Sequence, residues 1–309
     1  MKWPLATLLL LLVVRTAADE LAYSRKEVIY GRTYGLALTM DVFTPRQNAN
    51  GAGVIVCVSE GWYSDPANIE PNIPRYVAPL IAKGYTVFAV CHGSNPKFAL
   101  PEIIEQTHRS VRFIRSKASD FGVDPGRIGI TGDSAGGHLS LMMGLSGKEG
   151  DPDAPDPVDR ESSRVQAVVA YFPPTDFLNW GESGKLMLGT HPTVPVQGAF
   201  DFQRLDEASN SLRLVTDPEE RKEIGKTVSP IYQVGRIGAP TLLVHGDNDQ
   251  LIPLQQSQLL AAKLHEAGIA SDFIVMPGGG HDGELIKAHT TQAMKWFDRF
   301  LAKQSEPLE

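Results

Sequence analysis

One serine lies in a sequence context that suits it for nucleophilic chemistry. Residues 132–136 read Gly-Asp-Ser-Ala-Gly, which makes Ser134 the central residue of a Gly-x-Ser-x-Gly motif. A short apolar segment from Ile128 leads into the motif, and a helical pattern with Leu139 and Leu141 follows it. A strand, a tight turn and a helix form a nucleophile elbow, whose small residues leave room for a strained serine. The motif also occurs by chance in other Gly-rich loops, so the flanking elements carry the prediction.

A serine hydroxyl is a weak nucleophile, and two downstream segments could supply the groups that activate it. It needs a base, and the base needs a third group that fixes its tautomer. Residues 245–249 read His-Gly-Asp-Asn-Asp after one apolar run, and residues 277–281 read Pro-Gly-Gly-Gly-His after the next. Both segments place polar side chains where an expected strand ends. We therefore expect Asp249 and His281 to lie beside Ser134.

Other residues compete for these two roles. Asp247 could be the acid, in which case Asp249 would cap the next helix. Most other histidines fit a general base less well because they fall in helical patterns. His92 follows an expected strand near the site, which suits a contact with substrate better than proton transfer.

Strand-like and helix-like segments alternate along most of the chain. Residues 27–30 and 36–43 flank a Gly-containing turn and predict an antiparallel hairpin. The strands that follow are separated by helical patterns, which favours an α/β fold with a mostly parallel sheet covered on both faces. The expected strands are 54–58, 86–90, 127–131, 165–171, 241–245 and 272–276, and the expected helices are 76–83, 102–117, 138–145, 255–267 and 284–301.

A long insertion interrupts this alternation between two expected strands. It runs from about residue 173 to 238 and joins Pro/Gly-rich segments to a charged helical pattern over residues 202–226. Insertions of this length are often lids or binding loops, so we expect a cap over the site. Residues 19–309 are then expected to form one domain that includes this insertion.

The composition bounds the possible partners and cofactors. The 309 residues are 42% hydrophobic and 21% charged, as in globular proteins, and the formal net charge is −7. Because no Lys/Arg-rich cluster occurs, nucleic acid is not an expected partner. No His, Cys, Asp or Glu group has metal-ligand spacing, so neither a metal nor an organic cofactor is expected.

The first residues have the pattern of a secretory signal peptide. Lys2 precedes an apolar run over residues 5–14, and small residues suited to cleavage follow at 16–18. This pattern predicts that residues 1–18 are removed and that the chain is secreted or periplasmic. The run is too short to span a bilayer, which takes about 20 apolar residues, and no later segment approaches that length. An uncleaved anchor is the alternative.

Two cysteines remain in the expected mature chain. Cys57 and Cys91 both lie at the ends of strand-like runs. If those strands are neighbours a disulfide could form, and otherwise the two residues are buried free thiols.

Several segments together resemble the α/β-hydrolase superfamily, in its esterase/lipase branch. The chain is most similar to hormone-sensitive-lipase-like carboxylesterases and to bacterial feruloyl and acetyl-xylan esterases. The resemblance rests on residues 40–45, 121–128, 132–138, 173–176 and 229–232 and on the loops at 249 and 281. It implies that Ser134 is the nucleophile, His281 the base and Asp249 the orienting acid. The implied reaction is cleavage of short-chain esters of the acetyl or feruloyl type through an acyl-enzyme.

One loop departs from the pattern of this branch. The family usually carries His-Gly-Gly-(Gly)-Trp after its third strand, whereas residues 59–62 here read Ser-Glu-Gly-Trp. Backbone donors do not depend on the side chain, so the N–H groups of Gly61 and Ala135 are still expected to hold the oxyanion. Trp62 is expected to shape the substrate pocket.

Glu60 and His92 are departures from the family pattern that affect which substrate is expected. The Glu60 carboxylate could raise the barrier by facing the developing negative charge, could point away, or could recognise a polar or cationic group. The family's usual Tyr-Arg pair after the fourth strand is replaced by Cys-His at 91–92. Both changes lie on the expected substrate side.

Two functions of other kinds remain open at this stage. A serine peptidase of the prolyl-oligopeptidase type shares the order of serine, acid and histidine, but it usually has an N-terminal propeller for which this chain has no room. A non-catalytic binding protein on the same fold would not need Ser134, Asp249 and His281 together.

Overall fold

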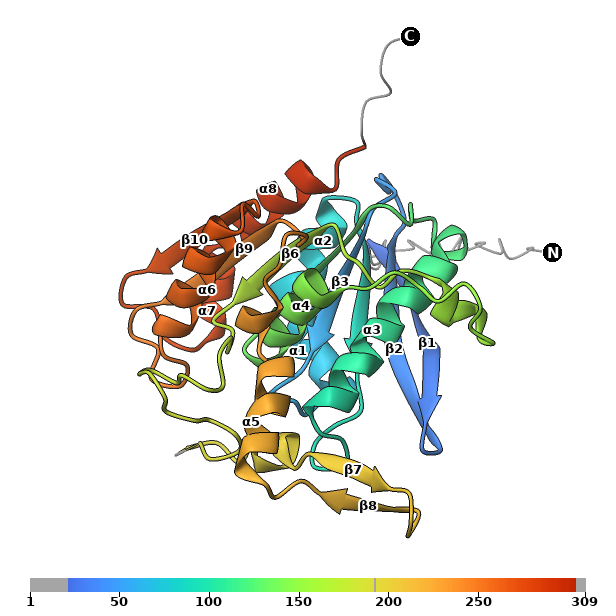
Figure 1. Ribbon diagram of the computed structural model, residues 1–309. Helices are drawn as coiled ribbons and strands as arrows, with labels where there is room; N and C mark the ends of the chain where they lie inside the picture. The colour runs from blue at the N-terminus through green and yellow to red at the C-terminus, as the bar shows by residue number, and fades with distance from the viewer. Residues whose placement is uncertain (1–21, 192, 304–309) are drawn as a thin grey trace, which may run out of the picture.

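The structure is a computed structural model that describes residues 22–191 and 193–303, so the expected signal peptide lies outside the described residues. An eight-stranded sheet runs through the centre in the order β1-β2-β4-β3-β5-β6-β9-β10 (Figure 1). Its strands are β1 (Tyr23–Thr33), β2 (Leu36–Pro45), β3 (Gly53–Val58), β4 (Thr86–Cys91), β5 (Ile128–Asp133), β6 (Ala167–Tyr171), β9 (Thr241–Gly246) and β10 (Ser271–Met276).

The expected hairpin forms one edge of this sheet. β1 and β2 pair antiparallel and are joined by Tyr34 and Gly35, which have φ angles of 46° and 80°. Two successive positive φ angles fit a tight two-residue turn that matches the twist of the strands. β2 also pairs antiparallel with β4, while the strands from β4 to β10 pair in parallel. The predicted mostly parallel sheet is thus confirmed.

Helices cover both faces of the sheet, as the alternating pattern predicted. One core contains apolar residues of α3 (Leu100–Ser116), α4 (Ala135–Ser146) and α6 (Gln255–Glu266). The other core contains residues of α1 (Ile69–Asn72), α2 (Ala78–Ala82), α7 (Gly283–Ala288) and α8 (Thr290–Phe300). The central strands β3, β4, β6 and β9 are buried along their whole length. Burial on both faces explains why these strands are apolar runs without alternation.

The two cysteines lie on neighbouring strands but face opposite sides of the sheet. Val58 pairs with Cys91 and Cys57 pairs with Val90, so the cysteines are one residue out of register. Successive side chains of a strand alternate between faces, which places Cys57 and Cys91 in different cores. Both are therefore free thiols, and burial raises the pKa of Cys57 to about 12 and that of Cys91 to about 11.

The segment between β6 and β9 is built differently from the sequence-based expectation. It contains a hairpin of β7 (Gln203–Asp206) and β8 (Ser211–Leu214), followed by α5 (Pro218–Thr227) (Figure 1, bottom). The prediction of a single charged helix over residues 202–226 is wrong in its first half, where the β7–β8 hairpin forms instead. Asp217 accepts a hydrogen bond from the Glu220 N–H and Pro218 begins the helix, so α5 starts there.

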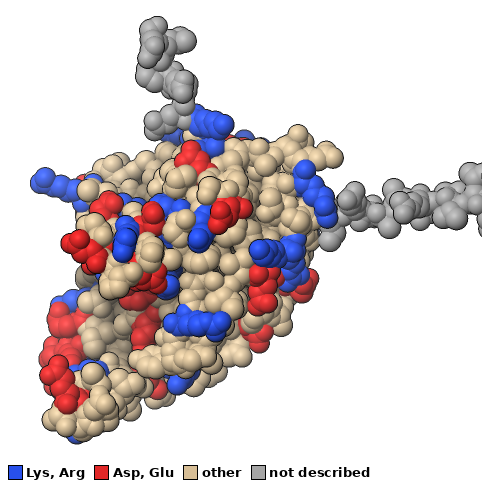
Figure 2. All heavy atoms as spheres, turned by 90° about the vertical axis from the view of Figure 1, so that its right-hand side faces the viewer, with Lys and Arg blue, Asp and Glu red and all other residues tan. Residues whose placement is uncertain are grey.

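On the face shown in Figure 2, cationic and anionic side chains are interspersed among large uncharged areas. Within the described ranges, no helix has the length and apolar character needed to cross a bilayer.

Candidate active site

The Gly-x-Ser-x-Gly motif forms the turn between β5 and α4. Ser134 has φ 51° and ψ −120°, a strained conformation for a residue with a side chain, and α4 begins at Ala135. A Cβ atom on Gly132 would lie 2.6 Å from the Gly136 carbonyl carbon, and one on Gly136 would lie 2.6 Å from the Cys57 carbonyl oxygen. Glycine at both positions is thus a steric requirement of the turn, which is the geometry of a nucleophile elbow.

Asp249 and His281 meet at the carboxyl edge of the sheet. His281 Nδ1 lies 2.8 Å from Asp249 Oδ2, and the Asp249 side chain is fully buried. Asp249 Oδ1 accepts hydrogen bonds from the backbone N–H groups of Leu251 and Ile252, at 2.8 and 2.9 Å. Asp249 therefore both contacts the histidine and caps the following turn.

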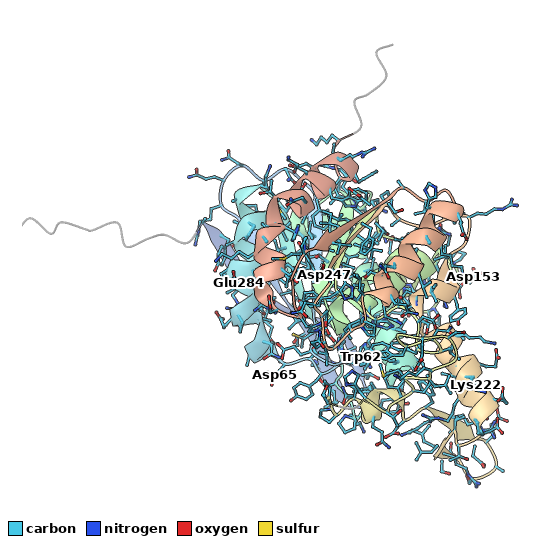
Figure 3. The ribbon with its side chains drawn as sticks, turned by 90° about the vertical axis from the view of Figure 1, so that its left-hand side faces the viewer. Trp62, Asp65, Asp153, Lys222, Asp247 and Glu284 are labelled. Atoms are coloured by element: carbon cyan, nitrogen blue, oxygen red, sulfur yellow. The ribbon has the colours of Figure 1, made fainter. Side chains whose placement is uncertain are left out.

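Asp247 makes a different contact. It lies in the loop that follows β9 (Figure 3). Its carboxylate accepts a hydrogen bond from the Gly278 N–H at 2.6 Å, and the residue is exposed. The alternative in which Asp247 is the acid therefore has no support in the geometry, because its carboxylate holds the glycine loop instead.

The environment of Asp249 keeps its carboxylate ionised. Burial raises its pKa, but hydrogen bonds from His245 and His281, together with the Ile252 N–H, outweigh burial and hold the pKa well below its usual range. Because an ionised carboxylate can only accept, His281 Nδ1 carries the proton. The lone pair of His281 Nε2 is then available to a nucleophile.

Close backbone packing brings His281 inward. β9 ends at Gly246, where a Cβ atom would lie 2.1 Å from the Gly279 carbonyl oxygen. Gly278 has a positive φ of 70°. The Phe172 ring packs against the imidazole of His281 with ring centroids 4.3 Å apart. The run of glycines before His281 thus allows a loop that lies directly on the end of the neighbouring strand.

The loop that was expected to bind the oxyanion is a tight turn. The backbone groups of Glu60 and Tyr63 exchange two hydrogen bonds of 2.8 and 2.9 Å. Gly61 and Trp62 between them have φ angles of 55° and 61°. The Asn95 side-chain amide donates to the Gly61 carbonyl oxygen at 2.7 Å, which fixes the turn against the segment after β4.

Two backbone donors remain free near the elbow. Across residues 22–191 and 193–303, neither the Gly61 N–H nor the Ala135 N–H donates to another backbone carbonyl. Gly61, Ala135 and Ser134 line one common cavity. This arrangement is compatible with the expected oxyanion site.

Trp62 is held by a histidine whose role the sequence did not reveal. Trp62 Nε1 donates to His138 Nδ1 at 3.2 Å, and His138 Nε2 lies 2.7 Å from the Val228 carbonyl oxygen. Burial lowers the pKa of His138 to about 4, so its ring is neutral and can accept from the indole. The indole also packs edge-on against Phe177 and Phe200. These contacts hold the Trp62 side chain in place, although the backbone of Trp62 has a positive φ.

The structure places His92 behind the loop instead of on the substrate side. It is buried, and its Nε2 lies 2.8 Å from Ser59 Oγ while its Nδ1 contacts the Gly93 carbonyl oxygen. It lines neither of the cavities that contain Ser134. The expectation that His92 contacts substrate therefore finds no support, because its ring holds the first residue of the loop.

Two cavities meet at Ser134. The inner one has a volume of about 60 Å³ and mostly apolar walls. Its larger side chains are Trp62, Trp180, Met187, His191, Val194, Val196, Leu251 and Ile252. The outer one has a volume of about 570 Å³ and contains His281 and the exposed Glu60. Its other polar residues are Ser59, Tyr63, Asn95 and Asp133.

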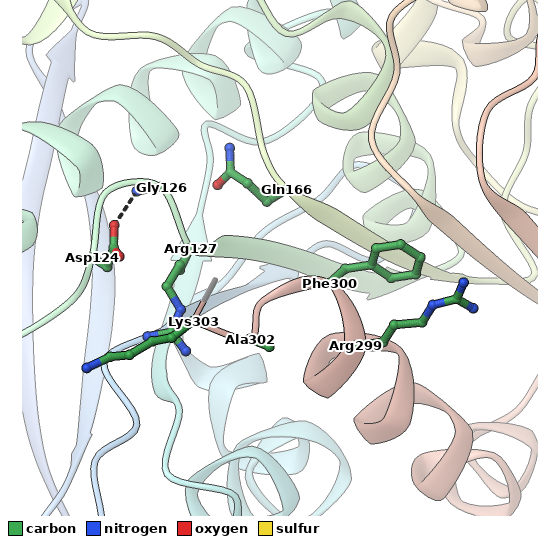
Figure 4. Close-up of a pocket in the computed structure, with 8 residues that line it drawn as sticks. All are labelled: Asp124, Gly126, Arg127, Gln166, Arg299, Phe300, Ala302 and Lys303. Atoms are coloured by element: carbon green, nitrogen blue, oxygen red, sulfur yellow. Dashed lines mark hydrogen bonds between the residues drawn. The ribbon is translucent and has the colours of Figure 1, made fainter. Parts of the chain in front are cut away.

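A third hollow lies away from the serine, beside the amino ends of β5 and β6. It has a volume of about 850 Å³, and Arg127, Gln166 and Lys303 are among its lining residues (Figure 4). Ligands of open parallel sheets bind at the carboxyl ends of the strands. The candidate active site is therefore the pair of cavities at Ser134.

Comparison with known proteins places the chain in a family. The BD-FAE family profile matches residues 40–264. The chain belongs to the BD-FAE family. The resemblance to α/β-hydrolases of the esterase/lipase branch is thereby confirmed.

Two curated relatives of this BD-FAE member are named as an ester hydrolase and an esterase. The probable carboxylic ester hydrolase LipM of Mycobacterium tuberculosis (strain ATCC 25618 / H37Rv) is 24% identical over 88% of this chain and 60% of its own length. Esterase LipQ of the same strain is 26% identical over 70% of this chain and 47% of its own length. The chain thus spans about half the length of these relatives. Their named activity is the class predicted from the sequence.

Solved structures confirm the α/β-hydrolase fold. A truncated carbohydrate esterase from gut microbiota has a TM-score of 0.72 and 26% identity, covering 90% of this chain and 98% of its own. An acetyl ester-xyloside bifunctional hydrolase from Caldicellulosiruptor lactoaceticus has a TM-score of 0.68 and 21% identity, covering 89% of this chain and 96% of its own.

Proposed function

We propose that this BD-FAE member is a serine ester hydrolase that removes small acyl groups through an acyl-enzyme. The observation that carries the proposal is the 2.8 Å contact between Asp249 and His281, because His281 lines one cavity together with the strained Ser134. The esterase names of its relatives support the same class.

The proposed mechanism assigns one role to each residue. Ser134 Oγ attacks the ester carbonyl while His281 Nε2 takes its proton, and Asp249 stabilises the resulting imidazolium. The N–H groups of Gly61 and Ala135 bind the oxyanion. His281 then gives its proton to the leaving alcohol. A water molecule, activated in turn by His281, attacks the acyl-enzyme and releases the acid.

The position of His281 supports an assignment of the two cavities. Because the imidazole must protonate the leaving alcohol, the alcohol belongs in the outer cavity, which His281 lines. The acyl group then occupies the inner cavity, with Trp62 as part of its wall. A volume of about 60 Å³ holds about four to six water molecules at ~10–15 Å³ each. This space favours acetyl-sized groups over feruloyl groups.

The outer cavity favours a polar alcohol. Glu60, Tyr63 and Asn95 offer a carboxylate, an aromatic face and an amide in a space of about 570 Å³. We propose that the acetyl group is carried on a hydroxyl-rich alcohol such as a sugar, with Glu60 as a hydrogen-bond acceptor for its hydroxyls.

We also propose that the enzyme works after export. The motif in residues 1–18 supports a cleaved signal peptide and a secreted or periplasmic location. Expression of the full chain in a bacterial host, followed by N-terminal sequencing of the exported protein, should give a start near residue 19. An intact N-terminus on the exported protein would contradict cleavage.

The catalytic proposal is tested by hydrolysis of p-nitrophenyl acetate with the wild-type protein and its Ser134→Ala variant. We expect turnover that the variant loses, and much slower turnover of methyl ferulate. Absent turnover, or equal turnover in both proteins, would overturn the ester hydrolase proposal and would direct assays to peptide nitroanilides.

A further inference from the structure

Two imidazole rings converge on one oxygen of Asp249. His281 Nδ1 lies 2.8 Å from Oδ2, and His245 Nε2 lies 3.3 Å from the same atom. His245 is the fifth residue of β9, and its side chain is fully buried. The mechanism proposed above does not use this second histidine.

The neighbours of His245 define its tautomer. Nε2 faces two acceptors, Asp249 Oδ2 and the Ile252 carbonyl oxygen at 3.1 Å, so this nitrogen carries the proton. Nδ1 lies 2.8 Å from Ser257 Oγ on α6, and it can accept from that hydroxyl. Ser257 is itself fully buried. The ring is therefore fixed between β9 and α6, with its Nε2–H shared between the Ile252 carbonyl oxygen and the Asp249 carboxylate.

His245 completes the set of donors around the carboxylate. Oδ1 accepts from the N–H groups of Leu251 and Ile252, and Oδ2 faces His245 and His281. An ionised carboxylate offers about four lone-pair sites, so all of them are occupied. Removing the His245 donor would free the Asp249 side chain to move and would leave more of its negative charge to act on His281.

We infer that His245 is a positioning residue of the proposed reaction, because its Nε2–H holds Asp249 in place and moderates the charge that His281 experiences. This inference rests on the proposed function. The predicted effect of losing the donor has two parts, a looser Asp249 and a stronger attraction between Asp249 and the His281 imidazolium.

The other charges around His281 stay unchanged in the variants that test this inference. Glu60 lines the outer cavity together with His281. Asp133 at the end of β5 acts on His281, and Asp133 is in turn influenced by Arg75 and hydrogen-bonded by Tyr76. None of these side chains contacts His245 in the described structure.

The experiment compares His245→Leu with His245→Gln. Gln can place an amide N–H where Nε2–H lies, whereas Leu fills similar space without a donor. With p-nitrophenyl acetate, we expect His245→Leu to lower kcat by about 10²-fold, as expected for a misplaced catalytic group, with little change in KM. The acid limb of its kcat/KM profile should move to higher pH. His245→Gln should bring both kcat and the pH of the acid limb back toward the wild-type values.

Matched controls separate this role from packing alone. Ser257→Ala removes the hydroxyl partner of Nδ1 but leaves the Nε2 contact, so its acid limb should coincide with that of the wild type. A folded His245→Leu protein with an unshifted limb would overturn the inference. A His245→Gln protein that is as impaired as His245→Leu would also overturn it.

A measurement on the wild-type protein tests the inference without activity or substitution. Nitrogen NMR of the labelled histidines should show His245 as the Nε2–H tautomer, with its N–H proton protected from exchange. An Nδ1–H tautomer would contradict the inference even if the variants do not fold. A wild-type protein that shows this tautomer yet has no Ser134-dependent turnover would instead refute the proposed function.

Discussion

The Asp249 carboxylate is the residue whose surroundings say most about the site. It is buried, yet its hydrogen bonds keep its pKa well below the usual range, so it stays charged beside His281. Asp247, two residues earlier, is exposed, and its carboxylate accepts from the Gly278 N–H of the glycine loop. The two aspartates therefore offer a matched comparison within one loop.

We predict that Asp249→Asn lowers kcat/KM for p-nitrophenyl acetate by about 10⁴-fold, because an amide can stabilise the wrong tautomer of His281 and cannot balance an imidazolium. Asp247→Asn should change kcat/KM by less than about tenfold, because an amide oxygen still accepts from Gly278. Initial rates of the two variants check this. Equal losses in both would contradict the assignment of Asp249.

A residue can be proposed from the sequence where a motif and the order of the residues limit the choice. Ser134, His281 and Asp249 could be chosen from motif and order. His245 and His138 could not be interpreted, because their roles depend on contacts made only in the fold. His245 contacts Ser257, 12 residues away, and His138 contacts Val228, 90 residues away. His92 was assigned to the substrate side because it follows β4, and only the packing of its ring against Ser59 shows otherwise.

At the scale of elements, the elbow between β5 and α4 depends on a backbone approach that admits no side chain. A Cβ atom on Gly132 would meet the backbone of Gly136 at 2.6 Å, and the helix end cannot move because it packs against Cys57 in the same way. Gly235 offers a contrast, since a Cβ atom there meets nothing within 4 Å and its φ is not positive.

We predict that Gly132→Ala lowers the free energy of unfolding by about 1–3 kcal/mol and abolishes Ser134-dependent turnover, because the turn must open to accept the methyl group. Gly235→Ala should change the free energy by no more than about 0.5 kcal/mol and leave activity intact. Urea unfolding and ester hydrolysis check both. A Gly132→Ala protein with wild-type stability would contradict the steric account.

The small inner cavity is an element-scale feature because its walls come from several segments. Trp62 lies after β3, Trp180 and Met187 lie in the insertion after β6, and Leu251 lies after β9. Trp296 on α8 is a similar buried indole on the opposite face of the sheet, where it packs against Phe300.

Trp180→Ala is predicted to raise the ratio of butyrate to acetate hydrolysis by at least about tenfold, because a pocket discriminates each methylene by roughly 1–3 kcal/mol. Trp296→Ala should lower the free energy of unfolding about as much as Trp180→Ala does, by about 3–5 kcal/mol. It should leave the ratio of butyrate to acetate hydrolysis unchanged. Values of kcat/KM for the two p-nitrophenyl esters check this. An unchanged ratio in Trp180→Ala would remove the inner cavity as the acyl site.

The elements also show where sequence patterns reach their limit. The buried parallel strands could be found because apolar runs bounded by turns are typical of a parallel sheet; they are β3, β4, β5, β6 and β9. The β7–β8 hairpin was missed because charged residues obscure its alternation of leucines at 205, 212 and 214. Likewise, the last expected helix is divided at His289 into α7 and α8, a break that its apolar periodicity does not indicate.

At the scale of the whole molecule, buried histidines link stability to pH. Burial lowers the pKa of His92 and His138 to about 4, and burial with the nearby Arg112 and Lys148 lowers that of His108 to about 3. Below a pH of about 6.5 these three histidines become protonated in the unfolded chain but stay neutral in the folded chain. The stabilisation of the neutral rings is thus complete above that pH and is lost as the pH falls toward about 4.

We predict that the free energy of unfolding falls between about pH 6.5 and about pH 4.5, by up to about 1.4 kcal/mol per pH unit for each buried histidine. His108→Gln should reduce this slope and leave ester hydrolysis unchanged, because His108 contacts Ser163 away from the site. Urea unfolding across the range measures the slope. The lowered pKa of Asp249 acts only in more acid solution, so it does not confound the window.

The central claim is that Ser134 attacks the substrate, and covalent capture tests it most directly. The protein would be treated with diethyl p-nitrophenyl phosphate, and the adduct located by intact mass and peptide mass spectrometry. We expect one diethyl phosphoryl group per chain, on the peptide that contains Ser134, with a parallel loss of p-nitrophenyl acetate hydrolysis. Hydrolysis that persists without an adduct, or an adduct on another residue that alone tracks the loss, would contradict it.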